Sequence, residues 1–137
     1  DVDASGGTVY RGVADKETVL TETGLIVYRF DAPLVFPNVA FFTERIDELV
    51  AEAGPGLKCV IFDAEAVSDF DSTAAEALET LDADLERRKI ELWIARANSP
   101  LRDLLQVTGL TIKMGEENIH PTVRAAVVAY HERFGTS

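Results

Sequence analysis

The segment of residues 60–75 places the tightest constraint on how this chain folds. It begins with Val-Ile-Phe at residues 60–62, a continuous apolar run with β-branched and aromatic members, which is typical of a strand buried on both faces. The run ends at Asp63, and after a short polar stretch the sequence Asp-Ser-Thr supplies oxygens that cap helices, just before periodic apolar residues. The segment therefore predicts a central strand, a loop and a helix, with its polar groups gathered at one end.

The start of this predicted helix is a candidate anion site. Its first backbone N–H groups have no partner within the helix, and the helix dipole is positive at this end, so a phosphate finds donors there. The candidate residues are Asp71, Ser72, Thr73 and Ala74. A structural role is the competing interpretation, because Thr73 with Glu76 fits a capping box and Ser72 or Asp71 can cap the helix without any regulatory purpose.

A short apolar segment lies between two prolines, Pro33 and Pro37. Prolines interrupt regular helix, so we expect an extended piece that exposes Leu34, Val35 and Phe36. Apolar side chains held in this way lose little entropy on docking, which makes the segment a candidate contact for a ligand or a partner protein. The alternative is a loop that only covers an edge of the sheet.

The order of the remaining elements predicts a mixed sheet. Residues 8–13 and 25–30 are expected to be strands joined by a loop over residues 15–24, and without a helix between them they open the fold as an antiparallel pair. The other expected elements are a helix capped by Asn38, a strand at 90–95, a short helix between Ser99 and Gly109, a strand at 110–113, and a terminal helix from Pro121. The prediction is a single α/β domain with about four to five strands and helices packed against them.

Composition limits the partners of this domain. The 137 residues are 47% hydrophobic, enough for one domain with its own core, and no apolar run approaches the ~20 residues of a membrane span. With 13 Lys and Arg against 24 Asp and Glu the net charge is −11, so we expect no binding to nucleic acid or directly to lipid. We expect residues 1–7 to be a flexible linker and residues 8–137 the domain, and a chain that starts at Asp1 suggests a fragment of a longer protein.

Other chemistry in the sequence is sparse. His120 and His131 stand apart from Cys59, without the spacing of a metal site or a catalytic triad. We therefore expect no enzymatic activity, no metal and no required cofactor. Asp63 and the acidic residues before the helix leave a receiver-like phosphoacceptor domain as an alternative, against which the opening strand pair and the lack of a clear Lys-Pro strand end both count.

Residues 60–75 also resemble the Asp-Ser-Ser-Gly region of STAS domains, which are the anti-sigma factor antagonists of bacteria and the cytoplasmic tails of SulP anion transporters. Thr73 falls at the serine that is phosphorylated in the antagonists, and Ala74 replaces the glycine. Residues 30–38 are similar to the Gly-Pro-Leu-Phe-Phe-Ala-Asn stretch of SulP tails, with Ala32 for glycine and Pro37 for alanine. Residues 99–110 and 119–123 extend the resemblance over nearly the whole chain.

This resemblance implies a cytoplasmic regulatory domain of a SulP-family, sulfate-type anion transporter, at the cytoplasmic face of the membrane, whose partner is the transmembrane part of its own chain. It also implies Thr73, or else Ser72, as a phosphorylation site for a regulatory protein or kinase. A purine nucleotide such as GTP or GDP is a further implied ligand, near the helix start and beside Pro33, Leu34 and Phe36. The alternative is a free-standing anti-sigma factor antagonist, switched by phosphorylation at Thr73 or Ser72.

Overall fold

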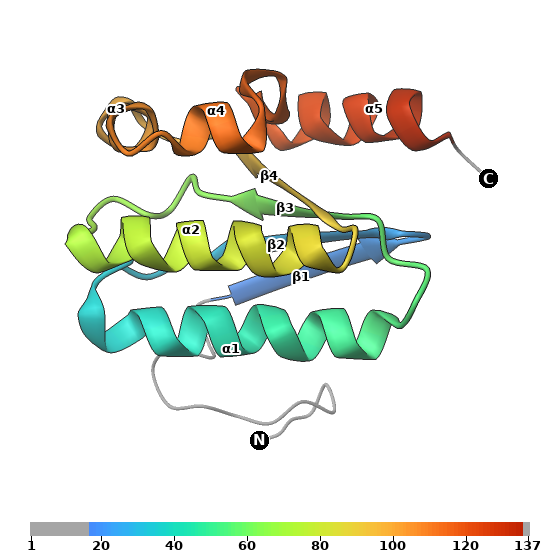
Figure 1. The fold of residues 1–137 in the computed structure, drawn as a ribbon, viewed down its shortest axis with the longest axis horizontal. Helices are drawn as coiled ribbons and strands as arrows, with labels where there is room; N and C mark the ends of the chain where they lie inside the picture. Colours follow the sequence, from blue (N-terminus) through green and yellow to red (C-terminus); the bar gives the residue numbers. More distant parts are fainter. Residues whose placement is uncertain (1–16, 136–137) are drawn as a thin grey trace.

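A five-stranded sheet with the spatial order β1-β2-β3-β4-β5 organises the fold (Figure 1). The structure is a computed structural model, and it describes residues 17–135. Its strands are β1 (Glu17–Glu22), β2 (Leu25–Phe30), β3 (Cys59–Asp63), β4 (Glu91–Ala95) and β5 (Ile119–His120). β1 is antiparallel to β2, and all the other neighbours are parallel. The predicted mixed sheet with an antiparallel opening pair is confirmed.

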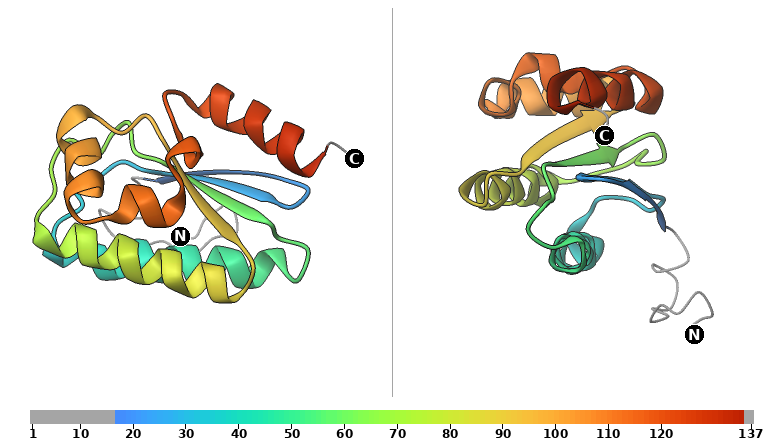
Figure 2. Two further views of the ribbon diagram at one scale, coloured as in Figure 1. Left: turned by 45° about the horizontal axis from the view of Figure 1, so that its top comes forward. Right: turned by 90° about the vertical axis from the view of Figure 1, so that its right-hand side faces the viewer.

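Helices cover both faces of this sheet. They are α1 (Phe36–Ala53), α2 (Ser72–Arg87), α3 (Ser99–Val107), α4 (Leu110–Met114) and α5 (Val123–Phe134), with a 3-10 turn at Glu116–Asn118. Figures 1 and 2 show α1 and α2 side by side along one face of the sheet. The buried side chains of α5 pack on the other face. None of the helices within residues 17–135 has the length and apolar character needed to cross a membrane.

The central strand β3 divides the core into two layers. Val60 and Phe62 face the larger cluster under α1 and α2, whereas Cys59 and Ile61 face the smaller cluster under α5. Alternate residues of a strand point to opposite faces, so a strand covered on both sides must be apolar throughout. All four side chains are fully buried, as predicted for a central strand and for a cysteine that acts as a small hydrophobe.

The first strand lies where the sequence suggested a loop. Residues 17–22 pair with β2 along their whole length, although 15–24 was expected to be irregular, and the strand predicted at 8–13 lies outside the described residues. β1 is mostly exposed, so its Glu-Thr-Val-Leu-Thr-Glu sequence lacks the apolar density of a buried strand. Its first residue is nevertheless fixed, because the Glu17 carboxylate accepts hydrogen bonds from Tyr28 and Arg45, both at 2.8 Å.

Two further predictions were wrong. Residues 110–113 belong to helix α4 and not to a strand, because Leu110 and Met114, four residues apart, both face the core. Helix α1 begins at Phe36, earlier than expected, with Pro37 in its first turn, where the missing N–H of proline costs nothing. Asn38 is therefore not the N-cap, and its side chain donates instead to the Pro33 carbonyl at 2.9 Å.

Candidate functional site

The two candidate segments of the sequence meet where β2 and β3 end and α1 and α2 begin, which we call the carboxyl end of the sheet (left side of Figure 1). A backbone bridge pairs Leu34 with Phe70. The Leu34 N–H donates to the Asp69 carbonyl at 2.9 Å, and the Asp71 N–H donates to the Leu34 carbonyl at 3.4 Å. The proline-bounded segment and the loop before α2 are therefore held together by main-chain hydrogen bonds.

One carboxylate caps both helices at this point. Asp71 is the N-cap of α2, and its Oδ1 accepts hydrogen bonds from the Thr73 N–H at 3.0 Å and from the Thr73 hydroxyl. Its Oδ2 accepts from the Phe36 N–H, the first amide of α1, at 2.9 Å. The Thr73 hydroxyl, followed by the Phe36 N–H, holds the pKa of the Asp71 carboxyl below its usual value. The chain thus supplies its own anion to two helix N-termini.

This arrangement changes how the helix start can bind a ligand. Thr73 lies inside the first turn and not at the N-cap, so the expected capping box with Glu76 does not form. The Thr73 N–H is bonded to the side chain of Asp71 and the Ala74 N–H to its carbonyl, at 3.0 Å each. A phosphate that bound these two amides would have to displace Asp71. Ser72 is exposed beside them.

The apolar candidates differ in their exposure. The Phe36 side chain is 74% exposed and Pro33 is also exposed, but Leu34 is fully buried in the core under α1. The prediction of an exposed run from Leu34 to Phe36 is therefore wrong at Leu34. Its carbonyl and N–H are engaged in the bridge, and its side chain points inward before the chain turns into α1.

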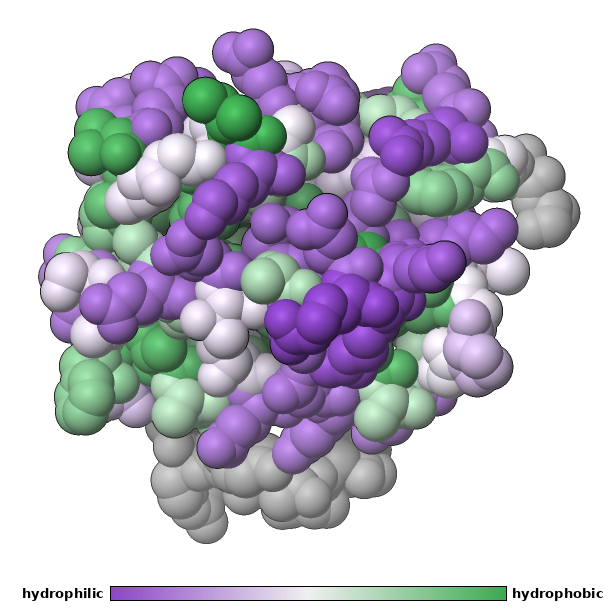
Figure 3. Space-filling view, in the orientation of Figure 1, coloured by the Kyte–Doolittle hydropathy of each residue, from purple (hydrophilic) through white to green (hydrophobic). Residues whose placement is uncertain are grey.

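A groove of about 590 Å³ runs between α1 and α2 from this point, and we call it the α1–α2 groove. Phe36 and Thr73 lie at its amino end. The apolar lining comes from Val39, Ala40, Ala77 and Leu81, and the charged lining from Asp47, Glu76, Asp84 and Arg87. Figure 3 shows apolar side chains interspersed with charged ones over these two helices. The groove offers an apolar contact surface with a mostly acidic rim.

A second group of polar residues at the carboxyl end of the sheet was missed by the sequence reasoning. Arg29, Asp63 and Arg96 come together there, because Arg29 and Asp63 are partners in register and Arg96 follows β4 directly. The signal in the sequence was a charged residue within one position of the end of each of three strands. The pairing of the strands is needed to see that these ends are neighbours.

The two histidines take separate structural positions. The His120 ring packs on Trp93 with 5.1 Å between ring centroids, its Nε2 is buried without a hydrogen bond, and burial lowers its pKa. His131 pairs with Glu22. Within residues 17–135, no three His, Cys, Asp or Glu side chains are grouped so that they could hold a metal ion.

Comparisons with known proteins agree with this fold. The sequence model of the STAS domain family matches residues 17–126. A probable sulfate transporter of Mycobacterium tuberculosis is 37% identical over 110 residues, which are 80% of this chain but only 20% of that protein. The STAS domain of a SulP transporter from Vibrio cholerae has a TM-score of 0.71 at 23% identity, covering 84% of this chain and 87% of that one. An anti-sigma factor antagonist from Mycobacterium paratuberculosis has a TM-score of 0.68 at 18% identity, covering 82% and 91%.

Proposed function

The chain belongs to the STAS domain family, and we propose that it is the cytoplasmic regulatory domain of a SulP-type sulfate transporter. The observation that carries the proposal is the 37% identity to a probable sulfate transporter, over 80% of this chain. The chain spans about a fifth of that transporter relative, and in this proposal the rest of such a protein forms the transmembrane part that carries the anion. In this proposal the domain catalyses no reaction and needs no cofactor.

Its partner is the transmembrane part of the same chain, and the contact is made by Phe36 and the amino end of the α1–α2 groove. The Phe36 side chain is 74% exposed, and covering such a large apolar surface lowers the free energy of the complex with a partner. The backbone of Phe36 is fixed by Asp71 and by the adjacent proline, so little conformational entropy is lost on docking. Regulation requires that this contact differ between the transport states, because equal contact in both states would shift nothing.

The test is Phe36→Gln in the full-length transporter. The substitution removes the apolar contact without adding a charge beside Asp71, and we expect a lower initial rate of sulfate uptake at an unchanged amount of transporter in the membrane. Ile112→Gln is the matched control, because Ile112 is 85% exposed but lies on α4. Equal uptake by the wild type and Phe36→Gln would contradict the proposed contact, and loss of uptake in both variants would contradict its location.

Thr73, with Ser72 as the alternative, is the proposed target of a regulatory kinase. Phosphorylation of Thr73 would remove its hydroxyl donor from Asp71 and place a second anion beside that carboxylate. The expected result is a weaker hydrogen bond from the Phe36 N–H to Asp71, and hence a less fixed position of Phe36 in the contact surface. Phosphate incorporation in cells, measured by mass spectrometry, should fall in Thr73→Ala or in Ser72→Ala. Unchanged incorporation in the double variant would leave both residues with structural roles only.

A purine nucleotide such as GTP or GDP is the proposed small ligand of the same helix start. Because the Asp71 carboxylate already accepts the Thr73 N–H, the phosphate groups of the nucleotide would compete with it for this amide. In a titration of the labelled chain, GTP should shift the amide resonances of residues 72–75, and Asp71→Asn should strengthen the binding. Shifts spread evenly over the surface, or an unchanged affinity in Asp71→Asn, would count against this site.

A further inference from the structure

The group of charged residues at the carboxyl end of the sheet contains a buried carboxylate between two arginines. Asp63 is the last residue of β3, and its side chain is only 5% exposed. Arg29 of β2 is its partner in register on one side, and Arg96 follows β4 on the other. Both arginine side chains are about one-third exposed. The two guanidinium groups are thus partly exposed at the surface, and the buried Asp63 carboxylate lies beneath them as a counter-charge.

Asp63 orients Arg96 through two hydrogen bonds. Arg96 Nε donates to Oδ1 at 3.2 Å and Nη2 donates to Oδ2 at 2.8 Å, while the Glu65 N–H also donates to Oδ1 at 3.1 Å. The backbone of Arg96 has a φ of 60°, which costs free energy in a residue with a side chain. Its N–H donates to the His120 carbonyl at 3.0 Å. The position of this guanidinium is therefore set by several independent contacts.

An exposed carboxylate occupies the space between the two guanidinium groups. Glu65 Oε1 lies 2.5 Å from Arg29 Nη1 and 3.2 Å from Arg96 Nη1, although the Glu65 side chain is 48% exposed. Exposed ion pairs of this kind contribute little net free energy, because water screens them and the long side chains lose entropy. Arg29 Nε also donates to Asp31 Oδ1 at 2.7 Å, so Arg29 and Arg96 each have an aspartate partner beside Glu65. Glu65 is the most exposed of these three carboxylates and therefore the one that another anion can replace most easily.

A cavity of about 190 Å³ adjoins this site. Its charged lining comes from Arg29, Asp63 and Arg96, its apolar lining from Leu20, Val27 and Val123, and Thr18 also lines it. The apolar wall lowers the local dielectric constant, which strengthens the attraction of the guanidinium groups for an anion near the cavity. The cavity lies on the face of the sheet opposite to α1 and α2, so it is separate from the α1–α2 groove.

We propose that Arg29 and Arg96 bind a small divalent oxyanion, of the sulfate or hydrogen phosphate type, which replaces the carboxylate of Glu65. Guanidinium groups present paired N–H donors that match the oxygens of such anions. A monovalent carboxylate from solution would make no stronger contacts with the arginines than Glu65 makes. Glu65 also has the advantage of a high effective concentration, because it belongs to the same chain. Only an anion with more charge or more oxygens has a reason to displace it. The site does not depend on the role of the domain in transport.

The test is a titration of the isotope-labelled chain with sodium sulfate in place of sodium chloride at constant ionic strength. The amide and arginine Nε resonances of Arg29, Glu65 and Arg96 should shift and saturate together. Glu65→Gln removes the internal competitor and should tighten sulfate binding by about three- to tenfold. Arg29→Gln should abolish it while the pairing of Asp63 with Arg96 remains intact. Sodium acetate should bind more weakly than sulfate.

Two control variants separate this site from general charge effects. Glu132→Gln makes the same change of charge on the exposed face of α5 and should leave the affinity unchanged. Arg133→Gln removes an arginine that pairs with Glu91, which is the first residue of β4, whereas Arg96 follows its last. The proposal is overturned if the wild type shows no saturable shift at these residues, if Glu65→Gln does not tighten binding, or if Arg133→Gln weakens it as much as Arg29→Gln.

Discussion

Asp71 connects two helices whose first residues are far apart in the sequence. Its carboxylate accepts the first amide of α1 and an amide in the first turn of α2, so a single side chain fixes the positions of both helix starts. The amide of α2 that Asp71 caps belongs to Thr73, the proposed phosphorylation site, and the amide of α1 belongs to the exposed Phe36. Changes in the charge of this carboxylate therefore bear on the geometry of the candidate contact surface.

The contribution of Asp71 to stability should depend on pH. Its pKa is lowered in the folded state from a usual value of 3.8, so the folded protein binds this proton more weakly than the unfolded chain does. The stabilisation is complete above the usual pKa and is lost as the pH falls through the lowered one. In urea denaturation, Asp71→Asn should be less stable than the wild type at neutral pH, and the difference should narrow below about pH 4.

Asp69→Asn is the control for this measurement, because Asp69 is exposed two residues away and loses the same charge. It should change the free energy of unfolding little at any pH. A difference between the wild type and Asp71→Asn that stays constant down to the acid transition would show that the charge of Asp71 is not what holds the two helices.

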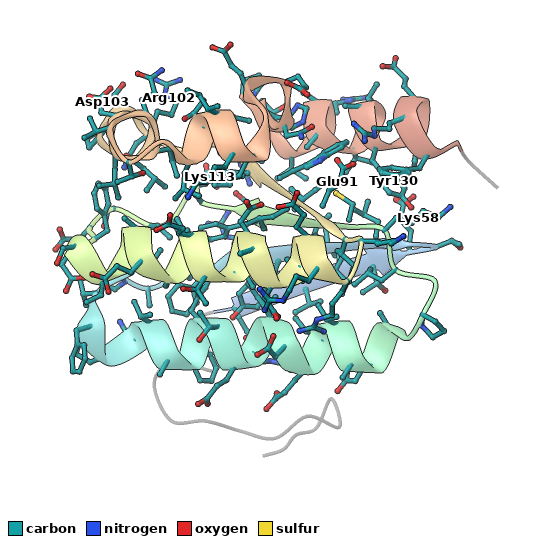
Figure 4. The ribbon with its side chains drawn as sticks, viewed as in Figure 1. Lys58, Glu91, Arg102, Asp103, Lys113 and Tyr130 are labelled. Atoms are coloured by element: carbon teal, nitrogen blue, oxygen red, sulfur yellow. The ribbon has the colours of Figure 1, made fainter. Side chains whose placement is uncertain are left out.

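Gly24 is the residue in the β1–β2 turn that tolerates least change. Its φ is +77°, and a Cβ there would collide with the hydroxyl of Tyr130, which donates to the Thr23 carbonyl at 2.8 Å. Tyr130 lies between α5 and the sheet, as Figure 4 shows. Gly24→Ala should therefore lower the free energy of unfolding by about 1–3 kcal/mol, from backbone strain and the displaced tyrosine.

Gly56→Ala is the matched control for Gly24→Ala, because nothing lies within 4 Å of a Cβ at that position. Chemical denaturation of both variants measures the difference. Similar stability of the two variants would mean that the turn adjusts and that the contact with Tyr130 is not rigid.

Among the helices and strands, the sequence predicted most accurately those elements whose apolar residues are fully buried. The apolar run of β3 is unambiguous because both faces are covered, and α2 was found because capping residues precede a periodic stripe. β1 was missed because an edge strand with one covered face need not be apolar. The five residues of α4 are too few for the helical and strand periods to differ, so tertiary packing decided that element.

The candidate site was predictable only in part, for a related reason. Capping and proline patterns are local, so the sequence pointed to both segments around Leu34 and Thr73. The bridge that joins them and the ion pair of Arg29 with Asp63 depend on strand register. Register follows from the assembled sheet and not from any one segment.

Amide hydrogen exchange should reveal a difference in stability between the strands. The amides of β3 should exchange most slowly, because they open only when both core layers open. Among the strands within residues 17–135, β1 pairs with β2 alone, and it should open locally. Arg45→Gln removes the contact of α1 with Glu17 and should accelerate exchange in β1 alone. If β1 and β3 exchange at the same rate, the sheet opens only as a unit and the assignment of β1 as a weak edge is wrong.

For the molecule as a whole, a net charge of −11 should decide which surfaces it avoids. The excess acid repels the anionic cytoplasmic leaflet and nucleic acids alike. In a sedimentation assay the purified chain should remain in the supernatant with vesicles that contain phosphatidylserine, where a polybasic peptide as the positive control should pellet. Sedimentation of the chain at physiological ionic strength would contradict the expectation that it reaches the membrane only through its partner.

The register of the first strand pair has a mechanical consequence. Glu17 is opposite Phe30, so the chain enters β1 at the carboxyl end of the sheet and not at the turn near Gly24. A force transmitted along the preceding residues would act on the domain at the end of the sheet where β2 ends and where Asp31 and the two arginines lie. The force would load the β1–β2 ladder from the end at which Glu17 pairs with Arg45. That ion pair would therefore be strained before the core residues were. A displacement of the preceding chain would thus reach the helix starts without crossing the sheet.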